Sequence, residues 1–170
     1  MNDYDPPYAI ARTTTEVELY LDLTVCARCG SDQTTWTHDI QAETLRSAGS
    51  CSRCGADREC LFSLPRRGPL DTEGTFGGPE PSELIDAGQW LAVADEIARG
   101  VAAGARSEQA QAAMAYAHRA VLEVLKFVQP GADAVPGDAF WTDAGRTERD
   151  RDPGRFRVDR LLAIRDSYSD

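Results

Sequence analysis

The chain has 170 residues, of which 42% are hydrophobic and 27% charged, and its formal net charge is -10. This length allows a buried core without disulfides, and this composition excludes an intrinsically disordered chain. The negative charge repels phosphate backbones and anionic lipids, so it favours a protein partner, and a basic one, over nucleic acid or a membrane.

The sequence shows no export signal. It has no apolar run of the roughly 18 residues that a membrane-spanning helix needs, and the segment from Met1 to Pro7 is acidic where a signal peptide would be basic and then apolar. We therefore expect a cytoplasmic protein. Lys126 is the single lysine among 18 basic residues, and alanine and glycine are plentiful, which indicates a GC-rich bacterial genome.

The first elements predicted are an extended lead-in and a strand. Residues 1–15 contain Pro6 and Pro7 and little periodicity, which is typical of an extended segment. From Val17 to Val25 apolar and polar residues alternate, the pattern of a half-buried strand. The sequence therefore predicts a strand that runs directly into the first cysteine pair.

Two Cys-x-x-Cys-Gly units follow, and they are the strongest signal in the chain. Without export features, paired cysteines favour a metal site over a disulfide framework. Structural zinc takes four tetrahedral ligands, which two tight turns supply with little strain. The sequence therefore predicts a structural Zn²⁺ site with these four ligands: Cys26, Cys29, Cys51 and Cys54.

With these two units, residues 17–65 resemble the zinc-ribbon group, in which two such turns at the ends of short strands hold one zinc. The resemblance implies the same four cysteine ligands and a small antiparallel β ribbon, but it implies no particular function. Iron in place of zinc and a redox dithiol are the alternatives that the cysteines leave open. Arg28 and Arg53, each next to a second cysteine, either offset the charge of the thiolates or are solvated turn residues.

Between and after the cysteine pairs the pattern is weaker. Thr34 to His38 is predicted as a strand and Ile40 to Arg46 as a turn or short helix. Arg58 to Leu64 is predicted as a strand, in which Cys60, Phe62 and Leu64 share a face.

The second half of the chain is predicted to be helical. Ser82 is the expected N-cap of a first helix that ends near Gly100, and Ser107 is the expected N-cap of a second that ends at Pro130. The short loop between them predicts antiparallel packing. Asp152 and Pro153 are expected to start a last helix. Phe140 and Trp141 are expected to anchor the segment before it to the core.

These elements predict an α+β protein in which a small antiparallel β zinc ribbon packs with an α-helical hairpin and a C-terminal helix. The expected divisions are an extended lead-in (1–15), the zinc ribbon (16–66), a Gly/Pro connector (67–82) and an α-helical region (83–170).

A few other residues are weaker candidates for chemistry. Cys60 with His38 has the composition of a nucleophile and base, although a buried strand cysteine and a surface histidine are the simpler interpretation. His118 lacks the Glu-x-x-His partner of a metal-binding bundle and is interpreted as a helix-surface or core-edge residue. The acidic side chains on the first predicted helix are either an acid and base pair or its solvated face: Asp86, Asp95 and Glu96.

Charge patterns bear on nucleic-acid binding. Residues 16–65 contain four arginines against eight acidic residues, the opposite of a DNA- or RNA-binding ribbon. Arg66, Arg67 and Trp36 alone favour such binding. Residues 146–160 mix arginines with carboxylates, which indicates ion-pair lacing or a polar interface more than an RNA-binding strip.

Our leading hypothesis is a non-enzymatic, zinc-binding protein-interaction module, either an adaptor or an immunity-type inhibitor of a basic toxin. The absence of a catalytic constellation in the sequence and the -10 charge motivate it. One alternative is a nucleic-acid-associated zinc-ribbon regulator. Another is an enzyme with a pocket between ribbon and helices, lined by Trp90, His118 and Trp141.

Overall fold

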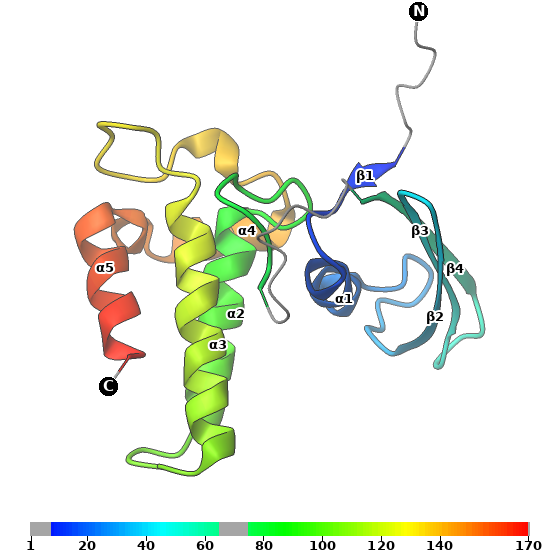
Figure 1. Ribbon diagram of the computed structural model, residues 1–170, viewed down its shortest axis with the longest axis horizontal. Helices are drawn as coiled ribbons and strands as arrows, with labels where there is room; N and C mark the ends of the chain where they lie inside the picture. Colours follow the sequence, from blue (N-terminus) through cyan, green and yellow to red (C-terminus); the bar gives the residue numbers. More distant parts are fainter. Residues whose placement is uncertain (1–7, 65–74, 170) are drawn as a thin grey trace, which may run out of the picture. The chain divides into compact units, whose positions relative to one another are not determined.

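The computed structural model describes residues 8–64 and 75–169, which form two compact units. The sheet unit holds the described residues up to Gly78 together with Ser82–Leu84, and the helical unit holds Pro79–Pro81 and the residues from Ile85 onward. Figure 1 shows a small sheet and one helix in the first unit and a group of helices in the second. The predicted α+β class is confirmed.

The sheet unit is built from a four-stranded mixed sheet in the order β1-β4-β3-β2. The strands are β1 (Ala9–Ile10), β2 (Thr34–Gln41), β3 (Thr44–Cys51) and β4 (Asp57–Ser63). β2, β3 and β4 are successive antiparallel neighbours, and β1 runs parallel to β4. β2 and β4 confirm two predicted strands. The turn or helix expected over residues 40–46 is wrong, because β2 and β3 form one hairpin whose loop is only Ala42 and Glu43.

The strand expected from Val17 to Val25 is also wrong, since residues Thr14–Leu23 form helix α1. A period of two contains every fourth residue, so the alternating pattern also places Val17 and Leu21 on one helix face, and these are the buried apolar residues of α1. Thr13 decides between the two structures. Its side chain accepts a hydrogen bond from the Glu16 amide and caps the helix N-terminus.

The core of the sheet unit lies between α1 and one face of the sheet. Val17 and Leu21 of α1 and Leu45 and Phe62 of the sheet are each at most 2% exposed. The Tyr20 ring meets the Phe62 ring edge-on, with centroids 5.7 Å apart. This apolar core is small for a unit of its size, and other interactions must add to it.

One such interaction is a buried ion pair at the start of α1, between Arg12 and Glu16. The Glu16 side chain is fully buried, and its carboxylate accepts hydrogen bonds from the Arg12 backbone N–H (2.7 Å), Nε (3.0 Å) and Nη2 (2.7 Å). Three donors from one residue compensate the burial of the Glu16 charge. Residues 8–15 are therefore built into the unit, as β1 and the cap of α1.

The helical unit contains four α-helices, α2 (Ala87–Gly100), α3 (Glu108–Leu125), α4 (Asp143–Arg151) and α5 (Val158–Ser167). Figure 1 shows α2 and α3 side by side, joined by a short loop, as the predicted antiparallel hairpin. Its core consists of side chains with no exposed surface, which include Trp90, Leu91, Ala94, Ala117, Val121, Val124 and Leu161.

Asp86, not Ser82, is the N-cap of α2, which corrects the predicted helix start. Asp86 and Gln89 form a capping box, in which each side chain accepts from the other's backbone N–H. Ser82 instead accepts from the Leu84 amide, outside the helix. Ser107 caps α3 as predicted.

Helix α4 was not predicted, because its sequence has almost no apolar residues. The last helix begins at Val158, after a 3₁₀ turn over Pro153–Phe156, and not at Pro153 as expected. Phe140 is buried against Phe156, with ring centroids 4.8 Å apart, which confirms it as an anchor. Trp141 is 41% exposed and leans on Phe127 at the unit's surface.

Several predictions reach outside the described residues. Residues 1–7 of the lead-in, 65–66 of the ribbon and 67–74 of the connector are not described, and Arg66 and Arg67 lie wholly in this part of the chain. Among the helices of residues 8–64 and 75–169, none combines the length and the apolar character that spanning a membrane demands.

Candidate metal centre

The four cysteines predicted as ligands come together in the structure. Their Sγ atoms lie within 4.8 Å of one another. Cys26 Sγ lies 3.7 Å from Cys54 Sγ, and Cys29 Sγ lies 3.6 Å from Cys51 Sγ. A tetrahedral site with Zn–S bonds of about 2.3 Å separates its sulfurs by about 3.8 Å. The cluster therefore has the spacing that one metal ion requires.

The two cysteine turns have the same backbone structure. In the first, the Cys26 N–H donates to the Ser31 carbonyl (2.7 Å), and the Gly30 N–H donates to the Cys26 carbonyl (2.7 Å). In the second, the equivalent bonds join Cys51 to Ala56 (2.9 Å) and Gly55 to Cys51 (2.8 Å).

Glycine is required at the end of each turn. Gly30 and Gly55 have φ of 71° and 68°, in the left-handed region that side chains with a Cβ rarely enter. The repeated Cys-x-x-Cys-Gly sequence thus encodes a repeated structure.

Backbone amides stabilise the thiolate of the first cysteine of each turn. Hydrogen bonds from the Arg28 and Cys29 amides lower the pKa of Cys26. A hydrogen bond from the Cys54 amide lowers the pKa of Cys51, burial raises it, and a bond from the Arg53 amide lowers it further. The result is a pKa of about 6 for Cys51. A lowered pKa favours the thiolate, which is the form that binds metal.

Cys29 shows the opposite effect. The Ser31 amide lowers its pKa, but burial and the three neighbouring sulfurs outweigh this and raise the pKa of Cys29 to about 11. Four sulfurs this close repel one another when ionised, so a cation among them is what allows the full set of thiolates to form.

Arg58 of β4 connects the two ends of the segment that contains the first cysteine turn. Its guanidinium donates to the Thr24 carbonyl and to Thr34 Oγ1, both at 2.7 Å, and lies 4.8 Å from the centre of the Trp36 ring. Thr24 and Thr34 stand on either side of the first cysteine turn, so Arg58 fixes both ends of that segment. The sequence offered no signal for this role, because it depends on the register of β4.

The second turn is linked to the same segment by one backbone hydrogen bond, from the Ser52 N–H to the Gln33 carbonyl (2.9 Å). Arg28 and Arg53 have exposed side chains. Their exposure agrees with the interpretation as solvated turn residues.

His38 and Cys60 are not adjacent, because β3 lies between their strands. His38 Nδ1 is 2.9 Å from Ser47 Oγ, and Ser47 is opposite Cys60 in the sheet. Ser47 has no exposed surface, and burial raises the pKa of the Cys60 thiol. A buried hydroxyl and a protonated thiol are poor nucleophiles, so this row of side chains is structural.

The acidic candidates on α2 have separate roles. Asp86 has no exposed surface, and its Oδ2 accepts from the Thr142 N–H (2.8 Å) and Oγ1 (2.7 Å), which joins the starts of α2 and α4. Asp95 forms a two-bond ion pair with Arg155 (2.7 and 2.8 Å) and accepts from the Tyr168 hydroxyl (3.1 Å). Glu96 is exposed. These carboxylates do not form an acid and base pair.

The three residues of the predicted pocket also separate. Trp90 is fully buried, and Trp141 leans on Phe127. His118 Nδ1 is 2.7 Å from Ser169 Oγ and lines a depression of about 450 Å³ beside α3, which neither tryptophan lines.

Comparison with known proteins gives no relative: no protein-family model, curated protein or solved structure matches this chain. Its function must therefore be argued from its own residues.

The cysteine centre fits a metal ion on three counts, namely sulfur spacing, amide donors and a set of four sulfur ligands. Such a ligand set suits zinc or iron. The described residues hold a possible zinc site.

Proposed function

We propose that this protein is a non-enzymatic binding module in which a structural Zn²⁺ holds the sheet unit together and an acidic surface binds a basic protein. Zinc is the first choice because four cysteines at tetrahedral spacing suit it, and it undergoes no redox change.

The cysteine centre supports a structural role for the ion. Catalytic zinc keeps one position for water or substrate, whereas four protein sulfurs fill the tetrahedron. Its location supports the same role, since the centre joins the segment before β2 to the end of β3. In this proposal the ion positions the sheet and takes no part in a reaction.

One observation favours a basic protein over nucleic acid as the partner: six of the seven arginines between residues 146 and 165 pair with carboxylates. Each of six arginines contacts a carboxylate of the helical unit. The pairs are Arg146–Asp143, Arg149–Asp150, Arg151–Glu148, Arg155–Asp95, Arg157–Asp133 and Arg165–Asp166.

Pairing removes the positive strip that an RNA backbone would need, and the -10 charge of the chain remains to attract a cationic surface. A stoichiometric inhibitor of a basic toxin and an adaptor both fit this charge. The first would occupy its target alone, and the second would hold a further protein at the same time.

The test is capture of partners on zinc-loaded, tagged protein, with half of each lysate treated with nuclease. The proposal expects a basic protein in about equimolar amount, unaffected by nuclease and released as salt rises, because screening weakens opposite charges. A captured species that disappears with nuclease, or nanomolar binding to labelled DNA or RNA, would instead establish the nucleic-acid alternative.

Cys51→Ser is the control that locates the binding surface. It removes one metal ligand from the sheet unit and none of the ion pairs of the helical unit. Loss of capture assigns the partner to the sheet unit, and retained capture assigns it to the helical unit.

A further inference from the structure

Strand β2 is an open edge of the sheet. It is the last strand in the order β1-β4-β3-β2, and no described strand lies beyond it. Gln41 is opposite Thr44 across a loop of two residues, and the Ser52 N–H bonds the Gln33 carbonyl.

In an antiparallel pair, alternate residues form the hydrogen-bonded positions. The bond from the Ser52 N–H to the Gln33 carbonyl makes Gln33 one of these positions, so the odd-numbered residues of β2 bond to β3. The N–H and C=O groups of the even-numbered residues point away from it: Thr34, Trp36, His38 and Ile40.

This edge lacks the usual protection against pairing. Proteins block an open strand with lysine, proline, a bulge or a covering segment. β2 pairs with β3 without a bulge over its eight residues, contains no lysine or proline, and has Asp39 as its single charged residue. Six of the eight residues are exposed, and Ile40 is 52% exposed.

We propose that β2 pairs antiparallel with β2 of a second copy of this chain, which joins two four-stranded sheets in a two-fold dimer. The strand is complementary to itself in one register. Trp36 lies opposite His38 of the second copy, Thr34 lies opposite Ile40, and the two Thr37 residues face each other at the two-fold axis.

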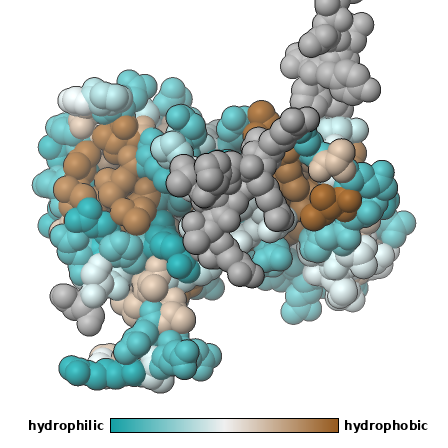
Figure 2. Space-filling view, in the orientation of Figure 1, coloured by the Kyte–Doolittle hydropathy of each residue, from teal (hydrophilic) through white to brown (hydrophobic). Residues whose placement is uncertain are grey.

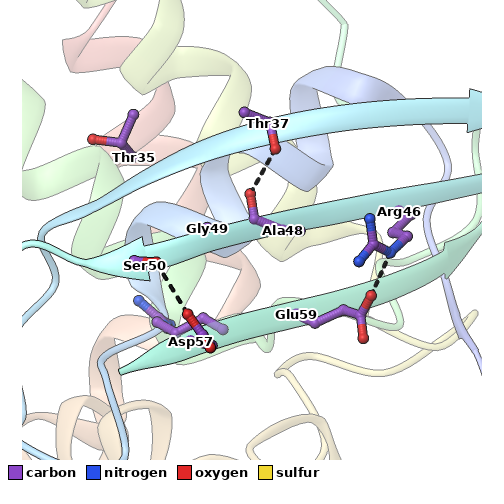
Figure 3. Close-up of a pocket in the computed structure, with 9 residues that line it drawn as sticks. Thr35, Thr37, Arg46, Ala48, Gly49, Ser50, Asp57 and Glu59 are labelled. Carbon is purple, nitrogen blue, oxygen red and sulfur yellow. Dashed lines mark hydrogen bonds and ion pairs between the residues drawn. The ribbon is translucent and has the colours of Figure 1, made fainter. Parts of the chain in front are cut away.

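This register uses all the free backbone groups of the edge. Each of the four outward-facing residues meets an outward-facing residue of the other copy, and all their N–H and C=O groups are paired. On the face of the sheet away from α1, Asp39 meets Thr35, whose hydroxyl donates to the carboxylate. Figure 3 shows Thr35 and Thr37 of β2 beside β3, with the Thr37 hydroxyl bonded to the Ala48 carbonyl.

Other registers are worse. Sliding the second strand by two residues in either direction leaves one outward-facing residue of each copy without its partner. Sliding it by four residues toward the hairpin loop brings the two Asp39 side chains together, which repel each other.

A second copy fits this edge better than a basic peptide does. Seven of its eight residues are uncharged, and the one carboxylate finds a hydroxyl of the second copy, so no cation is needed. The remaining charge of each chain opposes the dimer from a distance. Screening by salt should therefore strengthen the dimer, whereas it weakens the capture of a basic protein. Because the expected salt dependences are opposite, failure of one proposal can be told from failure of the other.

The first measurement is sedimentation velocity of the zinc-loaded full chain over a range of concentration, at about 0.05 M and about 0.5 M salt, where screening lengths differ about threefold. The expected result is a monomer–dimer equilibrium that shifts toward the dimer at high salt. A monomer under all these conditions would overturn the proposal.

A cysteine at the two-fold axis tests the register. In a Cys60→Ser background, Thr37→Cys places two Cα atoms about 4.5 Å apart at a non-hydrogen-bonded position, within disulfide range. Thr35→Cys is the matched control on the same face, since its two copies would stand about 13 Å apart along the strands. Mild oxidation with a glutathione buffer should cross-link the first and not the second. Equal cross-linking of both would contradict the register.

His38→Pro tests the backbone bonds. Its N–H does not bond β3, so the sheet and the zinc content should survive while the dimer is lost. A dimer that persists in a variant with full zinc content would overturn the proposal. If the variant loses its zinc, the Thr37→Cys and Thr35→Cys pair decides.

Discussion

The two units of this chain are stabilised in different ways. The helical unit buries an extensive set of apolar side chains between α2, α3 and α5, with Trp90 and Leu91 fully inside. Figure 2 colours the side chains of both units by hydropathy. The sheet unit buries few large apolar residues, of which Phe62, Phe76 and Leu21 are the largest, and adds a four-cysteine cluster and an enclosed ion pair. A unit with a small core needs such additional constraints.

Metal removal should produce the largest difference between the units. A structural zinc contributes roughly 10 kcal/mol or more to the folding of a small domain, which exceeds what a core of this size supplies. Cys51→Ser, or a strong chelator, should abolish zinc binding and the hydrogen-exchange protection of β2, β3 and β4, while α2 and α3 keep theirs. Mass spectrometry of the intact chain reports both quantities.

Cys60→Ser is the matched control, because Cys60 lies outside the four-sulfur cluster. It should keep a full zinc content. Protected strands in the metal-free chain would show that the apolar core of the sheet unit is sufficient, and the contrast between the units would then be wrong.

The buried ion pair gives the next largest effect. Glu16→Ala removes the buried carboxylate that accepts three hydrogen bonds from Arg12, and removal of one partner of a buried pair costs about 3–5 kcal/mol. The opening free energy of the sheet-unit amides, measured by hydrogen exchange, should fall by about this amount. Glu18→Ala, on the exposed face of α1, should change it by less than about 0.5 kcal/mol. Equal effects of the two variants would show that the ion pair does not stabilise the sheet unit.

In the helical unit the corresponding polar contact is Asp86. Asp86→Ala removes the cap of α2, at about 1 kcal/mol, and removes the acceptor of the part-buried Thr142 donors, at about 1 kcal/mol more. The free energy of unfolding of the helical unit, measured by urea denaturation, should fall by the sum of these two costs. Glu96→Ala, exposed on the same helix, is the control and should have little effect. A loss no larger than the about 1 kcal/mol of the cap would show that the hydrogen bonds to Thr142 of α4 contribute nothing to stability.

The sequence predicted the cysteine cluster completely and the surrounding fold only in part, for physical reasons. Each cysteine turn is local, since five residues, of which the last is a glycine, determine its backbone, and a sequence therefore shows such a turn directly. The surroundings depend on distant partners. Arg58 is an ordinary strand residue until the register places it beside Thr24, and Ser47 lies between His38 and Cys60 only because β3 is the middle strand.

Three of the differences between the predicted and the observed elements share one cause, which is that apolar periodicity does not determine where a helix is capped. The alternation from Val17 is compatible with both a strand and a helix, and the Thr13 cap selects the helix. Ser82 begins the right kind of pattern, but Asp86 with Gln89 forms the box that starts α2. Helix α4 has caps and ion pairs without an apolar stripe, so periodicity could not detect it.

The smallest effect expected comes from the glycine that ends a cysteine turn. A Cβ on Gly55 would meet no atom within 4 Å, so Gly55→Ala tests backbone conformation alone. With φ at 68°, an alanine there costs about 1–2 kcal/mol, and zinc affinity should fall by about tenfold in a competition titration.

Gly55→Asn is the decisive control, because asparagine is larger than alanine but tolerates the left-handed region better. Asparagine should therefore recover part of the affinity that alanine loses. If affinity instead falls with side-chain size, steric crowding and not the left-handed turn limits this position. Gly100→Ala, at the last residue of α2, should instead raise the stability of the helical unit by less than the roughly 1 kcal/mol by which alanine favours a helix interior over glycine. A glycine is therefore expected to stabilise the sheet unit where it ends a cysteine turn in the left-handed region, and to contribute little to the helical unit where it ends α2.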